Sequence, residues 1–204
     1  MKKILLLAVL ALALPTAVFA GSSVDYTNSG GNLSGSNRGL ALSGSVLIAV
    51  NGLNGGGLIT GNDLGSVGFG TGALTSGSLE MGGTFAGGGW FAITGDGSNG
   101  VPSGTLFQGS FSGPVTWTLI TLANGTHNYM LTGSLSGSTS SGAQVVGATV
   151  QLTINTGKGY FSGCTTISSG DTNIASAPEP GSLTLLGTGL IGLGGMIRRK
   201  FKNT

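Results

Sequence analysis

Apolar residues lie along the chain in short runs that Gly, Ser, Asn and Thr interrupt, and helical spacing is absent between residues 21 and 177. An amphipathic helix needs apolar residues at i, i+3, i+4 and i+7, whereas short runs bounded by turn formers indicate strands. The pattern predicts an all-β body, built as an antiparallel β-sandwich or an elongated β-stack. The expected strands are Leu40–Val50, Gly65–Leu74, Gly77–Phe85, Trp90–Thr94, Leu106–Phe111, Pro114–Leu122, His127–Leu135, Val145–Asn155 and Tyr160–Ile167.

One hairpin can be predicted residue by residue. Asn124-Gly125 is a favoured pair for a two-residue turn that requires positive φ at both positions. The resulting register places Trp117 opposite Thr132 on one face and Tyr129 opposite Ile120 on the other. Because both faces then carry large apolar groups, we expect this hairpin to be covered on both sides.

The N-terminus has the three parts of a secretory signal peptide. Lys2 and Lys3 precede the apolar run Ile4–Leu14, and a cleavage-site segment that ends in a small residue, Val18–Ala20, follows. The run is shorter than the roughly 20 residues that a membrane-spanning helix needs. We therefore expect residues 1–20 to direct the chain to the Sec translocon, with signal peptidase cutting between Ala20 and Gly21.

The C-terminus has a second ordered pattern. Pro178, Glu179 and Pro180 precede an uncharged stretch at 181–197, and the basic tail Arg198, Arg199, Lys200 and Lys202 follows. As a helix, this stretch would be about 25 Å long, at the short limit for a membrane span. Basic residues directly after a span mark its cytoplasmic side, so we expect the body to face outward.

This order of a Pro-Glu-Pro motif, a short apolar segment and a basic tail resembles the PEP-CTERM sorting signal of Gram-negative bacteria. The resemblance covers residues 178–204 and does not extend to the body. It implies that an exosortase recognises Pro178, Glu179 and Pro180 and cuts near them. It also implies anchoring in the inner membrane before processing, and location at the cell surface or outside the cell afterwards. Prolines on both sides of Glu179 favour an extended backbone that a processing enzyme can reach.

The chain thus divides into a signal peptide at 1–20, a Gly/Ser/Thr-rich β domain at 21–177 and a sorting signal at 178–204, with a motif at 178–180, a transmembrane helix at 181–197 and a basic tail at 198–204. Of 204 residues, 42 are glycine and 14 are charged. Only Arg38 and Lys158 are basic in the body, against five carboxylates, so its net charge is −3. This composition argues against a free cytosolic enzyme and against nucleic-acid binding.

Candidate chemistry in the body is sparse. His127 is the one histidine, so a multi-His metal site is excluded, and we expect neither a metal nor a cofactor. The Gly-x-Gly-x-x-Gly pattern at 95–100 precedes Val-Pro rather than a helix, which favours a tight turn over a phosphate site. Cys164 is the one cysteine, which excludes an intrachain disulfide, and we expect it to be buried. The body is therefore not expected to be an enzyme.

These features favour an exported, non-catalytic surface or extracellular-matrix protein that is associated with exopolysaccharide or biofilm, as the resemblance implies. The alternative is an extracellular carbohydrate-binding module. Its tentative sugar contacts are Trp90, Trp117 and Tyr129, for which packing in the core is the competing interpretation. An extracellular hydrolase is the least favoured class, because the sequence selects no pair of carboxylates.

Overall fold

The structure is a computed structural model that describes residues 23–175. The predicted signal peptide and the predicted transmembrane helix at 181–197 lie outside the described residues. Within 23–175, no helix has the length and apolar character needed to cross a bilayer. The strands are β1 (Ser23–Ser29), β2 (Asn32–Ser36), β3 (Gly39–Asn51), β4 (Ile59–Thr60), β5 (Gly65–Gly70), β6 (Leu74–Ser78), β7 (Gly82–Phe85), β8 (Gly88–Asp96), β9 (Ser103–Phe111), β10 (Val115–Thr121), β11 (His127–Thr139), β12 (Gln144–Asn155), β13 (Cys164–Thr166) and β14 (Ser169–Ala175), with one 3-10 turn, η1 (Leu53–Gly55).

Eight of these strands close into a barrel. The ring runs β1-β3-β5-β8-β9-β11-β12-β14 and returns to β1. All its neighbours pair antiparallel. Closure removes the unpaired edges that an open sheet exposes, and an eight-strand barrel is narrow enough for side chains to fill. The all-β antiparallel prediction is confirmed, but the body is a closed barrel rather than a sandwich or stack.

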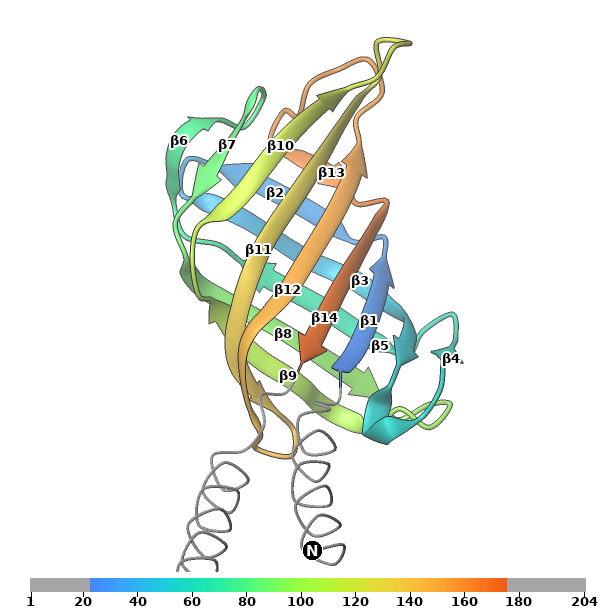
Figure 1. Cartoon of the computed structure of the whole chain (residues 1–204). Coiled ribbons are helices and arrows are strands. Elements are labelled where there is room, and N and C mark those ends of the chain that lie inside the picture. The colour runs from blue at the N-terminus through green and yellow to red at the C-terminus, as the bar shows by residue number, and fades with distance from the viewer. Residues whose placement is uncertain (1–22, 176–204) are drawn as a thin grey trace, which may run out of the picture. The chain divides into compact units, whose positions relative to one another are not determined.

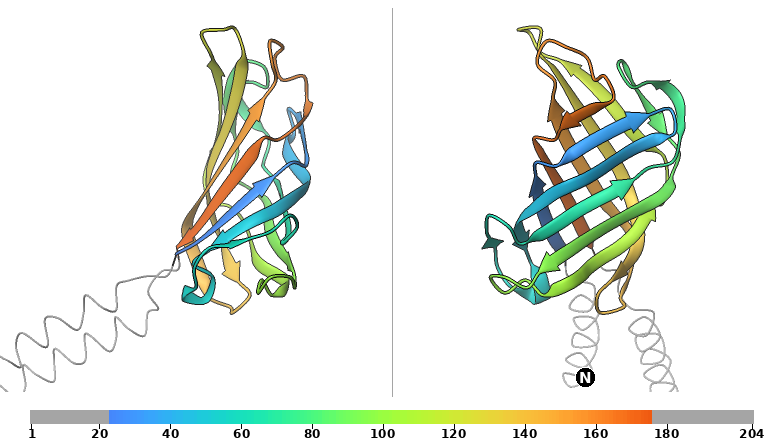
Figure 2. Two further views of the ribbon diagram at one scale, coloured as in Figure 1. Left: turned by 90° about the vertical axis from the view of Figure 1, so that its right-hand side faces the viewer. Right: turned by 180° about the vertical axis from the view of Figure 1, so that it is seen from behind.

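Two long strands each carry a branch beside the ring. β3 pairs with β1 through its second half and with β2 through its first, and β13 extends the β2 branch. β11 pairs with β9 near its end and with β10 near its start, and β7 and β6 extend the β10 branch. Figure 1 shows β10, β11, β12 and β14 on the near side, crossing the strands of the far side at a steep angle, and the right panel of Figure 2 shows β2, β3, β5, β8 and β9 from behind.

One-sided burial follows the two-residue period of the strands. In β12, Val145, Ala148, Val150, Leu152 and Ile154 are buried, and the residues between them are mostly exposed. Phe69, Phe91, Phe107 and Phe111 form an aromatic cluster with ring centroids 5.7–6.2 Å apart. Side chains therefore fill the interior, and the outer face carries mostly small and polar residues, with a few exposed apolar side chains such as Trp90 and Val146.

The predicted strands agree with the structure where apolar residues are dense. The predictions for β3, β8, β9, β10 and β12 lie within a few residues of the observed bounds, and β11 begins at His127 as predicted. The expected strand Gly77–Phe85 is wrong, because Gly77 and Gly82 have left-handed φ values of 76° and 90° and lie on either side of a hairpin turn. Of the expected strand Tyr160–Ile167, only Cys164–Thr166 is a strand, β13, and the sequence pattern does not predict β1, β2, β4 or β14.

The predicted register of the β10–β11 hairpin is wrong by one residue. The connection is a three-residue loop in which Leu122 N–H donates to the Thr126 carbonyl, and Gly125 has a φ of 78°. Asn124 does not have positive φ, so the pair does not form the expected two-residue turn. A type I turn followed by a left-handed glycine adds one residue to the loop and shifts the pairing.

Candidate functional site

The shifted register places two of the tentative sugar contacts in the core. Trp117 pairs with Leu131 and is 1% exposed, and Tyr129 pairs with Leu119 and is fully buried. The rings of Trp117 and Tyr129 stack with centroids 4.9 Å apart. The prediction that these two residues contact sugar on an exposed face is therefore wrong, because a one-residue slip moves a side chain to the other face.

The polar atoms of these two rings hold the turn between β6 and β7. Trp117 Nε1 donates to the Leu79 carbonyl at 2.9 Å, and the Tyr129 hydroxyl donates to the Glu80 carbonyl at 2.6 Å. The same hydroxyl accepts the Phe161 N–H at 3.0 Å. Burial raises the pKa of Tyr129, and the hydrogen bond from Phe161 opposes the increase. These contacts are structural, since buried aromatic residues with a polar tip need such partners.

Trp90, the third tentative sugar contact, lies on the outer face of β8. It is 51% exposed and pairs directly with Gly70 of β5. A methyl group at Gly70 would lie 2.8 Å from the indole nitrogen, and one at Gly68 would lie 3.0 Å from the far edge of the ring. The indole therefore rests on two glycines of β5, with much of its surface in solvent.

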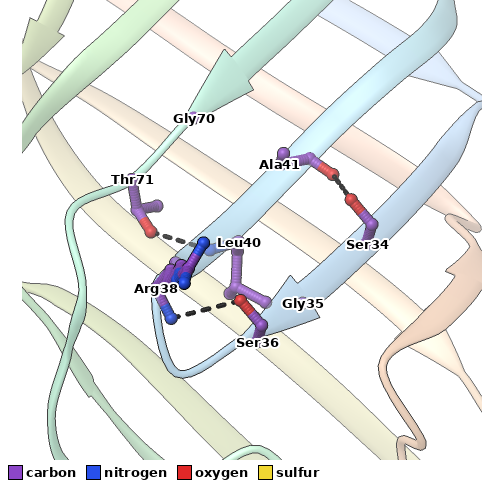
Figure 3. Close-up of a pocket in the computed structure, with 9 residues that line it drawn as sticks. Ser34, Gly35, Ser36, Arg38, Leu40, Ala41, Gly70 and Thr71 are labelled. Carbon is purple, nitrogen blue, oxygen red and sulfur yellow. Dashed lines mark hydrogen bonds between the residues drawn. The ribbon is translucent and has the colours of Figure 1, made fainter.

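A shallow hollow of about 320 Å³ adjoins Gly70 on this side of the barrel. Its lining comes from the β2–β3 hairpin and the end of β5, as Figure 3 shows: Ser34, Gly35, Ser36, Arg38, Gly39, Leu40, Ala41, Gly70 and Thr71. Local hydrogen bonds fix its rim, since Ser36 Oγ accepts the Arg38 N–H and Thr71 Oγ1 accepts the Leu40 N–H. Sequence reasoning did not find this hollow, because the pairing of β3 with β2 and with β5 creates it.

The other candidate residues lie apart from this hollow. His127 begins β11, stacks on Tyr160 with centroids 4.3 Å apart, and forms a hydrogen bond with Thr121 Oγ1 through Nδ1. Among residues 23–175, no group of three or more His, Cys, Asp or Glu gathers as metal ligands. Cys164 is exposed on β13, where Sγ donates to Asn32 Oδ1, so the expectation of burial is wrong. β13 lies at the end of its branch, where one face meets solvent.

The glycine pattern at 95–100 forms the connection between β8 and β9. Asp96 Oδ1 accepts hydrogen bonds from the hydroxyl and the N–H of Ser98, which hold the pKa of Asp96 below its usual range. Asn99 has a left-handed φ of 51°. This geometry confirms the prediction of a tight turn, since Asx bonding and left-handed residues are typical of turns.

The remaining predicted residues are Ala20, Gly21, Pro178, Glu179, Pro180 and the basic tail, which lie outside the described residues. The comparison with protein families bears on the C-terminal ones. Residues 176–200 match the family model of the PEP-CTERM protein-sorting motif. This chain carries a PEP-CTERM sorting motif. The match includes Pro178–Pro180 and Arg198–Lys200, while Lys202 lies beyond it.

The PEP-CTERM match confirms the resemblance found in the sequence. It indicates an exported protein that is anchored in the membrane before an exosortase processes it. The match does not reach the barrel. No curated protein and no solved structure matches the chain.

Proposed function

We propose that this chain is an exported, non-catalytic protein of the cell surface or extracellular matrix, in which the barrel is the delivered body. The Sec translocon exports it and signal peptidase cuts between Ala20 and Gly21. The C-terminal segment then holds it in the inner membrane until the exosortase acts near Pro178–Pro180. The observation that carries the proposal is the sorting motif at 176–200.

The chemistry of the barrel supports a non-catalytic body. Its five carboxylates and its histidine are spread over different strands and turns. Asp96 and Asp63 accept hydrogen bonds from turn backbones, and Asp25 and Asp171 bond to side chains of the neighbouring strand. These bonds give the four aspartates structural roles. A catalytic site instead brings titratable groups together with perturbed pKa values in a concave site.

The test of sorting is replacement of Pro178, Glu179 and Pro180 by alanine in a host that contains the exosortase. We expect the variant to accumulate unprocessed in the membrane fraction, because the recognised motif is gone. Pro114→Ala, in the turn before β10, is the matched control and should be processed as in wild type. Normal processing of the triple variant, measured by the mass of the released protein, would contradict the proposal.

The test of export is the N-terminal sequence of the purified protein. Cleavage between Ala20 and Gly21 predicts a mature chain that starts at Gly21, and a chain that retains Lys2 contradicts it.

The alternative function is an extracellular carbohydrate-binding module. Burial of Trp117 and Tyr129 removes them as contacts, so the alternative now depends on Trp90. Its half-exposed indole favours this function as an addition to a matrix role, in which the barrel associates with exopolysaccharide.

A further inference from the structure

A row of directly paired residues crosses five strands on the outer face, from Cys164 of β13, which pairs with Ser34 of β2, to Trp90 of β8. Ser34 of β2 pairs with Ala41 of β3, Ala41 with Gly70 of β5, and Gly70 with Trp90 of β8. Directly opposed residues of antiparallel strands point to the same face. Ser34, Ala41 and Trp90 are exposed, so the row lies on the solvent side. Its middle is a floor of small residues, with Trp90 at one end.

The hollow lies along the middle of this row, from Gly70 to Ser34. Ser34, Ala41 and Gly70 belong both to the row and to the lining of the hollow, and Arg38 lies on its rim in the β2–β3 turn (Figure 3). Three strand spacings separate Trp90 from Ser34, about 14 Å at 4.8 Å each. We call this surface, from Trp90 over Gly70 and Ala41 to Ser34 and Arg38, the outer groove.

The outer groove combines the groups that recognise a sugar chain. An exposed indole offers a flat apolar face for the C–H face of a sugar ring, and hydroxyls and a guanidinium offer hydrogen bonds to its polar edge. A guanidinium also binds carboxylates with two parallel hydrogen bonds. The 14 Å span is longer than one sugar ring, so the occupant is an oligosaccharide.

The charge of Arg38 distinguishes an acidic saccharide from a neutral one as the ligand of the outer groove. Arg38 and Lys158 are the two basic residues between 23 and 175, and the five carboxylates of the same segment make it net negative. An anionic ligand is repelled by such a body in general and attracted beside Arg38. We propose that the outer groove binds an acidic oligosaccharide, with one sugar ring on Trp90 and a carboxylate paired with Arg38. This inference rests on the proposed association with polysaccharide and names the surface and ligand class.

The test is binding of oligogalacturonate to the full chain in a detergent without sugar headgroups, followed by calorimetry. Maltohexaose is the neutral probe. We expect wild type to bind oligogalacturonate more tightly than maltohexaose, with weaker binding at high salt. Trp90→Ala should weaken binding of oligogalacturonate about tenfold or more, because it removes the stacking face. Arg38→Gln should lose the preference for the acidic probe, because its charge is removed.

Tyr160→Ala is the matched control, since Tyr160 is an aromatic residue of similar exposure, 48%, that stacks on His127 and is not among the residues of the outer groove. It should bind as wild type does. Any of three results would overturn the inference. The first is an equal loss of affinity in Trp90→Ala and Tyr160→Ala, and the second is equal affinity of wild type for both probes. The third is no binding by a wild type whose circular dichroism spectrum shows a folded β-sheet protein.

Failure of this inference and failure of the sorting proposal give different results. Trp90→Ala should be processed normally in the exosortase host while it fails to bind. If wild type is processed normally but binds no saccharide, only the inference about the outer groove is overturned. If the Pro178–Pro180 variant is processed normally, only the sorting proposal is contradicted.

Discussion

Gly109 of β9 and Gly137 of β11 are direct partners in the β9–β11 pair, one of the pairs that close the barrel. A methyl group at Gly137 would lie 2.6 Å from the Gly109 Cα, and one at Gly109 would lie 2.9 Å from the Gly137 Cα. Non-bonded carbon atoms normally lie about 3.5–4.0 Å apart. Neither glycine has left-handed φ, so an added side chain acts through contact distance rather than backbone strain. We predict that Gly137→Ala destabilises the barrel.

The magnitude follows from this distance. The two strands must separate by about 1 Å to restore a normal contact, which takes neighbouring backbone hydrogen bonds of about 2.9 Å beyond their useful range. Loss of about two such bonds, each near 1 kcal/mol, gives a destabilisation of about 2 kcal/mol. At an unstrained site, Gly→Ala stabilises by about 0.4–1 kcal/mol through the unfolded state, so the sign itself tests the argument.

The assay is urea denaturation of the full chain in mild detergent, followed by tryptophan fluorescence, since Trp117 is buried. Gly113→Ala is the control, because a methyl group there has no neighbour within 4 Å and its φ is not left-handed. We expect Gly113→Ala to match or slightly exceed wild type in free energy of unfolding. A Gly137→Ala variant as stable as Gly113→Ala would refute the close approach of β9 and β11.

Two tyrosines give further predictions. Tyr129→Phe should lower the free energy of unfolding by about 2–3 kcal/mol in the same assay, because it leaves the Glu80 carbonyl and the buried Phe161 N–H without their partner. Tyr160→Phe should change it little, and equal losses would argue against this assignment. Burial raises the pKa of Tyr26 to about 12 from 10.0, so the folded state keeps a proton that the unfolded state releases. The free energy of unfolding that Tyr26 contributes below pH 10 is then lost as pH rises towards 12, by on the order of 1–2 kcal/mol. The Tyr26→Phe variant should lose less stability over this range. An equally steep fall of its denaturation midpoint would contradict the prediction.

The strands that the sequence predicts with nearly correct bounds have several apolar residues, whereas the missed strands have only one or two at interior positions. β14 buries Gly170, Thr172 and Ile174, and β1 buries Tyr26 and Asn28. The buried amide of Asn28 donates to Ser45 Oγ, so a polar side chain occupies an interior position with a partner from another strand. A polar residue at such a position gives no apolar signal in the sequence. It can be buried because pairing with β3 supplies its hydrogen-bond partner.

The error in the candidate site has the same origin as the error in register. Assigning a two-residue turn at Asn124-Gly125 put Trp117 and Tyr129 on opposite faces, and the three-residue loop puts both inside. Local turn preference cannot distinguish these loops, since Asn-Gly suits both a two-residue turn and a type I turn that ends in a left-handed glycine. Tertiary burial of Trp117 against Tyr129 and Phe161 selects the longer loop. The outer groove depends on pairing between β2, β3, β5 and β8, so it too is invisible to local pattern.

Closure of the barrel also explains how sorting can leave the body intact. Ser23 and Ala175, the first and last described residues, are direct partners in the β1–β14 pair. The Pro178–Pro180 motif follows Ala175 by only the residues Ser176 and Ala177 in the sequence. A cut at or after this motif therefore removes no residue of a strand within 23–175, and every backbone pair of the ring is retained. Because closed pairing leaves β14 with a partner on each side, exosortase processing need not expose an unpaired edge on β14.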